Sequence, residues 1–124
     1  MTNTIETPLT RNLFEVFGER DASKRAAAIA AIWAEDGIFI HPQGRFVGHE
    51  GVNRAVVQLY VKFPDFVFTA IGSSQAFHGI GRQAWGFGQP DKPPQVTGLD
   101  IVTVRDGRIA ALFAFIDGPA GTHG

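Results

Sequence analysis

The chain has 124 residues and a formal net charge of −1, and it contains no cysteine. This length fits one domain that can bury a core without metals or disulfides, and the missing cysteines exclude disulfides, thiolate zinc sites and a cysteine nucleophile. Basic residues are scattered, which excludes a typical nucleic-acid-binding surface. Hydrophobic residues make up 44% and charged residues 19%, so we expect extra apolar surface to line a cavity or a subunit interface.

No apolar run reaches the length of a membrane span, and the N-terminus lacks the basic start and apolar stretch of a signal peptide. We therefore expect a cytoplasmic protein with no membrane contact. Residues 1–124 are expected to form a single domain, with a core over about residues 8–117 and mobile ends.

The first third of the chain predicts two helices. Thr7-Pro8 suits a helix start, because threonine caps free N–H groups and proline fits the first turn. Apolar residues then recur at helical spacing from Leu9 to Phe17. Asp21 or Ser23 can cap a second, alanine-rich helix. We expect that helix to end at Asp36-Gly37, since glycine readily takes the left-handed conformation.

A short strand pair and a third helix follow. Residues 37–41, GIFIH, are rich in β-formers, and Pro42 and Gly44 favour a turn before a brief strand over residues 45–47. The third helix opens at Gly48-His49-Glu50 and stops at Pro64.

The rest of the chain alternates like β-strands. Gly72 indicates a bulge, which bends a strand, and Asp106-Gly107 is a strong signal for a two-residue hairpin turn. The strands are expected over residues 66–71, 83–87, 96–104 and 109–116. Helices early and strands late indicate an α+β domain. About three N-terminal helices packed on a curved, mostly antiparallel sheet would form a cone with a pocket at its mouth.

One carboxyl stands out in this pattern. Asp100 lies in a strand, residues 98–102, that otherwise consists of core residues. Desolvation raises the pKa of a carboxyl in apolar surroundings, so such a group can act as a general acid or base near neutral pH. Alternatively, Asp100 could cap backbone groups or pair with Arg82 or Arg108.

The aromatic residues are expected to divide between the core and a binding site for a small apolar ligand. The candidates for ligand contact are Phe14, Phe17, Trp33, Tyr60, Trp85, Phe113 and Phe115. No close histidine pair and no glycine-rich phosphate loop occurs. We therefore expect neither a metal nor an organic cofactor.

This order of elements resembles the nuclear transport factor two-like superfamily, and within it the SnoaL-like and ketosteroid-isomerase-like branch. The resemblance covers about residues 8–117. The segments that carry it are IWAEDG (32–37), FIHP (39–42), GHEGV (48–52), FPDF (63–66), Trp85, GLD (98–100), VRDGRI (104–109) and FID (115–117).

The resemblance implies a cone with a deep pocket that often dimerises through the open sheet face. Enzymes of this branch shift protons beside carbonyls, close rings by aldol chemistry or eliminate water from apolar or cyclic substrates. Asp100 matches an aspartic acid that donates to the substrate oxyanion in ketosteroid isomerases, and His41 matches the position of their general base. Alternatively, His41 has no catalytic role and is a solvated residue beside a turn.

The chain departs from that pattern on the first helix. Ketosteroid isomerases carry an oxyanion-hole tyrosine there, whereas this helix offers Leu13, Phe14 and Phe17. Three functions therefore stay open. The first is a cofactor-free acid–base enzyme of isomerase, cyclase or dehydratase type. The second is a ligand-binding domain without catalysis. The third is an association module that forms a homodimer through the exposed sheet face, with Phe113, Phe115 and Val102 expected partly in the interface.

Overall fold

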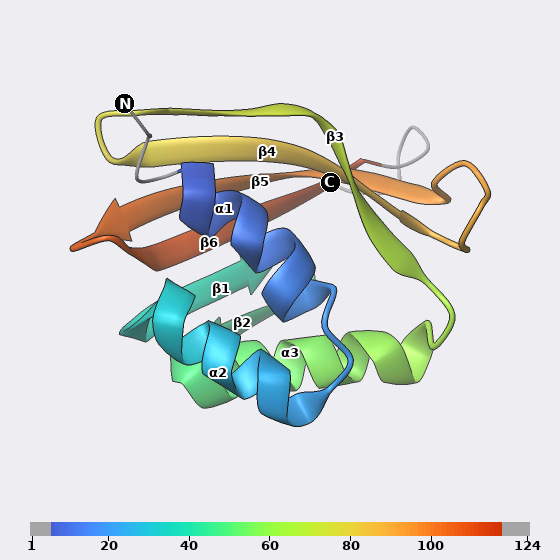
Figure 1. Ribbon diagram of the computed structural model, residues 1–124, viewed down its shortest axis with the longest axis horizontal. Coiled ribbons are helices and arrows are strands. Elements are labelled where there is room, and N and C mark those ends of the chain that lie inside the picture. Colours follow the sequence, from blue (N-terminus) through green and yellow to red (C-terminus); the bar gives the residue numbers. More distant parts are fainter. Residues whose placement is uncertain (1–5, 118–124) are drawn as a thin grey trace.

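The computed structural model describes residues 6–117, in which the helices precede most of the strands (Figure 1). The helical segments are α1 (Glu6–Arg11), the π-helix η1 (Asn12–Phe17), α2 (Ala22–Ile32) and α3 (Gly48–Lys62). The strands are β1 (Trp33–His41), β2 (Gly44–Val47), β3 (Val67–Phe77), β4 (Ile80–Gly88), β5 (Val96–Arg105) and β6 (Arg108–Asp117). Within residues 6–117, no helix has the length and apolar character needed to cross a membrane.

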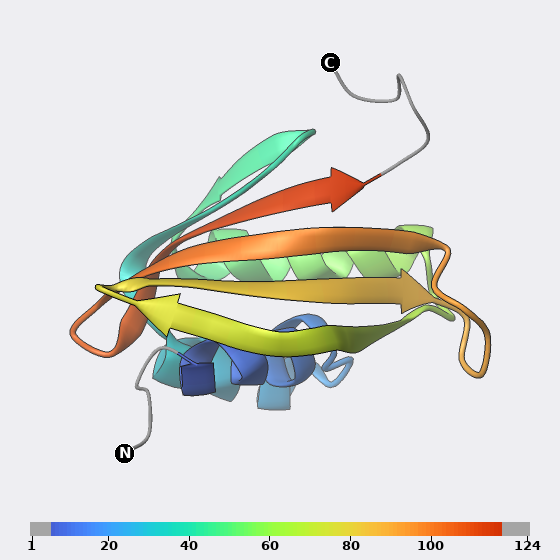
Figure 2. The same cartoon turned by 90° about the horizontal axis from the view of Figure 1, so that it is seen from above.

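All the strands belong to one sheet with the order β2-β1-β6-β5-β4-β3. Neighbouring strands are antiparallel except for β1 and β6, which are parallel. The helices pack on one face of this curved sheet, and in Figure 2 strands β3, β4 and β5 cross in front of them. The α+β class and the mostly antiparallel, curved sheet predicted from the sequence are therefore confirmed.

Local sequence explains the start of α2 but not its end. The Asp21 carboxylate accepts the backbone N–H of Lys24 at 2.9 Å, as expected of an N-cap. The predicted helix end at Asp36-Gly37 is wrong, because α2 stops at Ile32 and residue 33 begins β1. The predicted cap of the first helix at Thr7 concerns a side chain outside the described ones.

Tertiary contacts of Trp33 account for the early end of α2. Its ring is fully buried, and its Nε1 donates to Asn12 Oδ1 at 2.7 Å. Its carbonyl oxygen lies 2.9 Å from His49 Nε2. A Cβ on Gly37 would lie 2.7 Å from the Trp33 ring, so this glycine provides room for the indole instead of capping a helix.

The predicted bulge at Gly72 is confirmed. Gly72 has a φ of +69°, and the pairing of β3 with β4 shifts register between Ile71 and Gln75. The buried Gln83 amide donates to the carbonyls of Ile71 and Gly72, at 3.4 and 3.3 Å, which satisfies acceptors near the bulge. The predicted turn at Asp106-Gly107 is also present, with both residues in the left-handed region.

The two faces of the sheet differ in their cover. The inner face, under the helices, contributes Val102 and Leu112 to the main core. The opposite side, which we call the outer face, carries Ile71, Ile80 and Phe115 and is covered by no element among residues 6–117. The sequence-based expectation that Val102 lies at this outer face is wrong, because Val102 is fully buried on the inner face.

Candidate functional site

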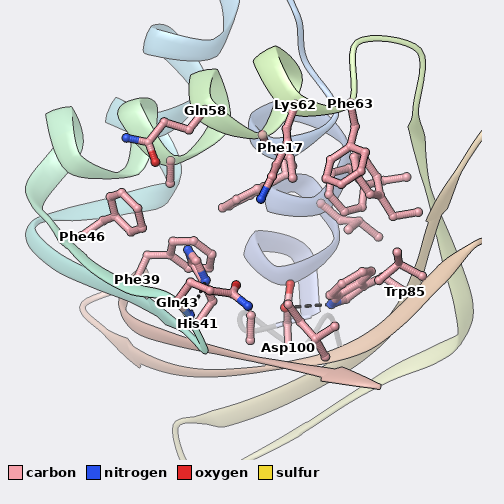
Figure 3. Close-up of a pocket in the computed structure, with 18 residues that line it drawn as sticks. Phe17, Phe39, His41, Gln43, Phe46, Gln58, Lys62, Phe63, Trp85 and Asp100 are labelled. Atoms are coloured by element: carbon pink, nitrogen blue, oxygen red, sulfur yellow. Dashed lines mark hydrogen bonds between the residues drawn. The ribbon is translucent and has the colours of Figure 1, made fainter. Parts of the chain in front are cut away.

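A cavity of about 480 Å³ lies between the inner face of the sheet and the helices (Figure 3). This volume is typical of sites for small organic ligands. Its polar lining residues are His41, Gln43, Gln58, Lys62 and Asp100. The apolar lining consists of Leu13, Phe17, Phe39, Phe46, Ala55, Leu59, Phe63, Phe68, Trp85, Phe87, Val96, Ala114 and Ile116. The cavity is therefore a largely aromatic chamber with few polar groups.

Asp100 projects into this cavity from β5. Directly across the sheet it pairs with Ala114 on β6 and Gln83 on β4. Trp85 Nε1 donates to Asp100 Oδ1 at 2.9 Å, and no other described side chain bonds to this carboxyl. Figure 3 shows the other oxygen directed into the cavity. The alternative pairing with Arg82 or Arg108 is wrong, since Arg82 binds Gln75 on the other face and Arg108 pairs with Arg105 beside the β5–β6 turn.

Burial dominates the electrostatics of Asp100. The residue is 8% exposed, and desolvation of the carboxylate raises the pKa of Asp100 to about 7, although the Trp85 hydrogen bond works in the opposite direction. At neutral pH this group can thus both release and accept a proton. A bound molecule can reach its second oxygen, because that oxygen faces the cavity.

The position of Trp85 depends on a glycine in the neighbouring strand. Trp85 pairs directly with Gly98, and a Cβ on Gly98 would lie 2.2 Å from Trp85 Cζ2. The indole therefore packs closely against the backbone of Gly98, which lies two residues before Asp100 on β5, and its N–H reaches the Asp100 carboxyl. In the sequence, this arrangement corresponds to a glycine two residues before Asp100. The glycine can be linked to Trp85 only when the pairing register of β4 and β5 is known.

His41 lies at the end of β1 and is half-buried at the cavity wall. Its ring stacks on Phe46, with centroids 5.4 Å apart and planes at 23°. Nδ1 accepts the backbone N–H of Gln43 at 3.2 Å, and burial lowers the pKa of His41. The neutral ring therefore carries its proton on Nε2. The structure places His41 and Asp100 on the same cavity, and the His41 ring is partly buried there.

Two of the aromatic residues expected to contact a ligand, Phe17 and Trp85, line the cavity. Tyr60 does not line it, but its hydroxyl donates to the Phe17 carbonyl at 2.5 Å and so ties the end of η1 to α3. Trp33 belongs to the closed core, and Phe14, at 44% exposed, points away from the cavity. The expectation that these three residues line this cavity is wrong.

Phe113 and Phe115 do not line the cavity either. Phe115 pairs across the sheet with Leu99, whereas Asp100 pairs with Ala114. Because successive side chains alternate between faces, both phenylalanines lie on the outer face. The inner positions of β6 at this level are Ala114 and Ile116, and both line the cavity.

Sequence reasoning missed several lining residues on α3. Ala55, Gln58, Leu59 and Lys62 occupy positions i, i+3, i+4 and i+7, which lie on one helical face. The other histidines are not among the described residues that line the cavity. His49 contacts Trp33, His78 is exposed in the β3–β4 turn, and His123 lies outside the described residues. In residues 6–117, no group of three potential metal ligands lies together.

Comparisons with known proteins identify the family and find solved structures with the same fold. The family model of the SnoaL-like domain matches residues 10–112. Curated proteins yield no match. Among solved structures, a proposed isomerase of the SnoaL-like family from Agrobacterium tumefaciens superposes with a TM-score of 0.86 at 24% identity, covering 94% of this chain and 100% of that one.

Two further structures show the same architecture. A proposed ketosteroid isomerase from Kribbella flavida has a TM-score of 0.73 at 17% identity, covering 98% of this chain and 83% of the other. A proposed SnoaL-like polyketide cyclase from Jannaschia has a TM-score of 0.73 at 13% identity, covering 94% and 90%. At such identities the likeness establishes the fold, which hosts many reactions. The family match over residues 10–112 shows more: this chain belongs to the SnoaL-like domain family.

Proposed function

We propose that this chain is a cofactor-independent acid–base enzyme that acts on an apolar cyclic or carbonyl substrate, as an isomerase, cyclase or dehydratase. One observation carries the proposal. Asp100 is buried, takes a single hydrogen bond from Trp85, and directs its second oxygen into an aromatic cavity. A buried carboxyl that takes only one hydrogen bond is costly for a fold, and we propose proton transfer to a bound ligand as the reason for its presence.

Asp100 and His41 take complementary roles in this proposal. With a pKa of about 7, Asp100 removes a proton from the carbon beside a carbonyl and returns it to another position. His41, neutral and protonated on Nε2, donates a hydrogen bond to the carbonyl oxygen as negative charge develops there. These roles reverse those implied by the family resemblance, in which the group at position 41 is the base.

The test uses hydrogen–deuterium exchange beside a ketone. In D2O at neutral pD, wild-type protein is expected to accelerate exchange of the C1 protons of 2-tetralone, followed by NMR. Asp100→Asn keeps an oxygen that can accept from Trp85 but cannot transfer a proton. We expect the protein-dependent rate to fall at least about 100-fold. The wild-type rate rises with pH up to about 7, as the Asp100 carboxylate forms.

Asp106→Asn is the matched control, because Asp106 lies in the exposed β5–β6 turn and asparagine tolerates its left-handed backbone. This control is expected to exchange at the wild-type rate. Wild-type rates in Asp100→Asn would remove Asp100 from the chemistry. If 2-tetralone binds to wild-type protein without any accelerated exchange, the proposal of catalysis fails and the alternative of a non-catalytic binding domain replaces it.

A further inference from the structure

We infer that the ligand of this cavity is an apolar ring system bearing a carboxylate, with the carboxylate bound by Lys62 and the ring directed toward Asp100. The inference deepens the proposed function and rests on it. It starts from the distribution of charge around the cavity. Of its lining residues, Lys62 alone carries a permanent charge, because the imidazole of His41 is neutral and Asp100 is divided between its two forms.

Lys62 lies on the side of the cavity formed by α3. It is exposed, one helical turn after Gln58, and Figure 3 shows both residues extending from α3 across the cavity from Asp100. Gln43, in the β1–β2 turn, is the third exposed polar residue that lines the cavity, and Figure 3 shows it beside His41 and away from Lys62. On the side formed by α3, the Lys62 ammonium and the Gln58 amide therefore offer several hydrogen-bond donors to a carboxylate.

Among residues 6–117, Asp100 is the only acidic residue that lines the cavity. The ion pairs among residues 6–117 join Arg11 to Glu15 and Arg105 to Asp36, and neither involves Lys62. Burial and the Trp85 hydrogen bond account for the shifted pKa of Asp100. The cavity thus has a cationic side and, away from it, an uncharged aromatic wall with one carboxyl. This polarity fits a ligand that is anionic at one end only.

A cation in the last turn of a helix also has a structural use, because it complements the partial negative charge of the helix end. That use accounts for a lysine at this position but requires no ligand. The two explanations differ in what replacement changes. A purely structural Lys62 affects stability alone, whereas a carboxylate-binding Lys62 changes the relative affinity for anionic and neutral ligands of equal shape.

The experiment measures binding of 2-naphthoate and of its neutral isostere 2-naphthamide by titration calorimetry. Wild-type protein is expected to bind the naphthoate about tenfold more tightly, the size of a charge-assisted hydrogen bond at a partly solvated site. Lys62→Gln is expected to abolish this preference by weakening naphthoate binding alone. Lys24→Gln, which removes an exposed lysine from α2 outside the cavity, is the matched control and is expected to keep the preference.

A second variant locates the probes. Ala114→Phe places a bulky ring directly opposite Asp100 and is expected to weaken both probes strongly. Equal affinity of the two probes for wild-type protein, a preference that survives in Lys62→Gln, or no binding of either probe would each overturn the inference. The 2-tetralone exchange assay is a separate measurement. Dependence of that exchange on Asp100 would preserve the proposed function even where the carboxylate preference fails.

Discussion

The ionisation of buried Asp100, which the proposed chemistry requires, also lowers the stability of the folded protein. In the unfolded chain its carboxyl ionises with a pKa of 3.8, whereas burial in the folded protein raises the pKa to about 7. The folded state therefore holds the proton more tightly, and ionisation at higher pH disfavours folding. Stability related to Asp100 is greatest below the unfolded pKa and declines as the pH rises through about 7.

Replacement by asparagine removes this pH dependence. The difference between 3.8 and about 7 corresponds to roughly 4 kcal/mol of unfolding free energy. Relative to Asp100→Asn, wild-type protein is expected to lose up to that amount between about pH 4 and pH 8. Urea unfolding of both proteins across this range measures the difference. Parallel stability profiles would show that Asp100 ionises in the folded state as easily as in water.

At the level of elements, the contact between β4 and β5 sets the properties of Asp100. In Gly98→Ala, the new methyl group would lie 2.2 Å from Trp85 Cζ2 and 2.5 Å from the Phe115 carbonyl oxygen. We expect a loss of about 1–3 kcal/mol in unfolding free energy from overpacking. We also expect the displaced indole to lose its bond to Asp100, which moves the pH profile of 2-tetralone exchange upward.

Trp85→Phe separates the two effects of that substitution. Phenylalanine keeps a ring on β4 but removes the N–H donor, so the pH profile is expected to move in the same direction. In the double variant with Gly98→Ala, the smaller ring is expected to recover part of the lost stability. A wild-type pH profile in both single variants would show that the indole does not influence Asp100.

Sequence alternation identified the strands but could not orient all of them. A strand with one polar face reveals its inner side, but residues 109–116 are apolar on both faces, because the outer face of the sheet is itself apolar. Alternation therefore does not decide whether Phe113 and Phe115 face the cavity or the outer face. The inward orientation of Asp100 was inferred correctly from its apolar neighbours, but its partner Trp85 depends on cross-strand register, which alternation does not encode.

The helical segments show the same division between local and distant causes. The cap at Asp21 involves atoms three residues apart, so the local sequence sufficed to predict it. The end of α2 depends on Trp33, whose partners are 21 and 16 residues away in the chain. Likewise, the π-helical turn of η1 buries Asn12, Leu13, Val16 and Phe17 and leaves Phe14 outside, which a regular α-helical pattern does not reveal.

At the scale of the whole molecule, the exposed apolar outer face of the sheet is a candidate surface for dimerisation. Its side chains include Ile71, Ile80 and Phe115, the last of which is 57% exposed. We propose that two copies of this chain pair through this face, because an apolar sheet surface without cover is stabilised by burial. Sedimentation of wild-type protein at micromolar concentration is expected to give a dimer of 13.4 kDa chains.

Phe115→Glu is expected to convert this dimer into monomers, since it places a charge in the apolar contact. Val61→Glu on α3 is the control, because Val61 is 78% exposed and lies away from the sheet. A dimer in the control and a monomer in the Phe115 variant would support the pairing. Monomeric wild-type protein, or a dimer that tolerates both changes, would assign the outer face another role.

The irregular course of β3 has a consequence for how molecules meet in a crowded solution. β3 is an edge strand of eleven residues, and a long straight edge would offer its free N–H and C=O groups as a template for strands of other molecules. The left-handed backbone of Gly72 and the register shift after Ile71 interrupt that template near its middle. We therefore expect the interruption at Gly72 to hinder the growth of β-aggregates from this edge.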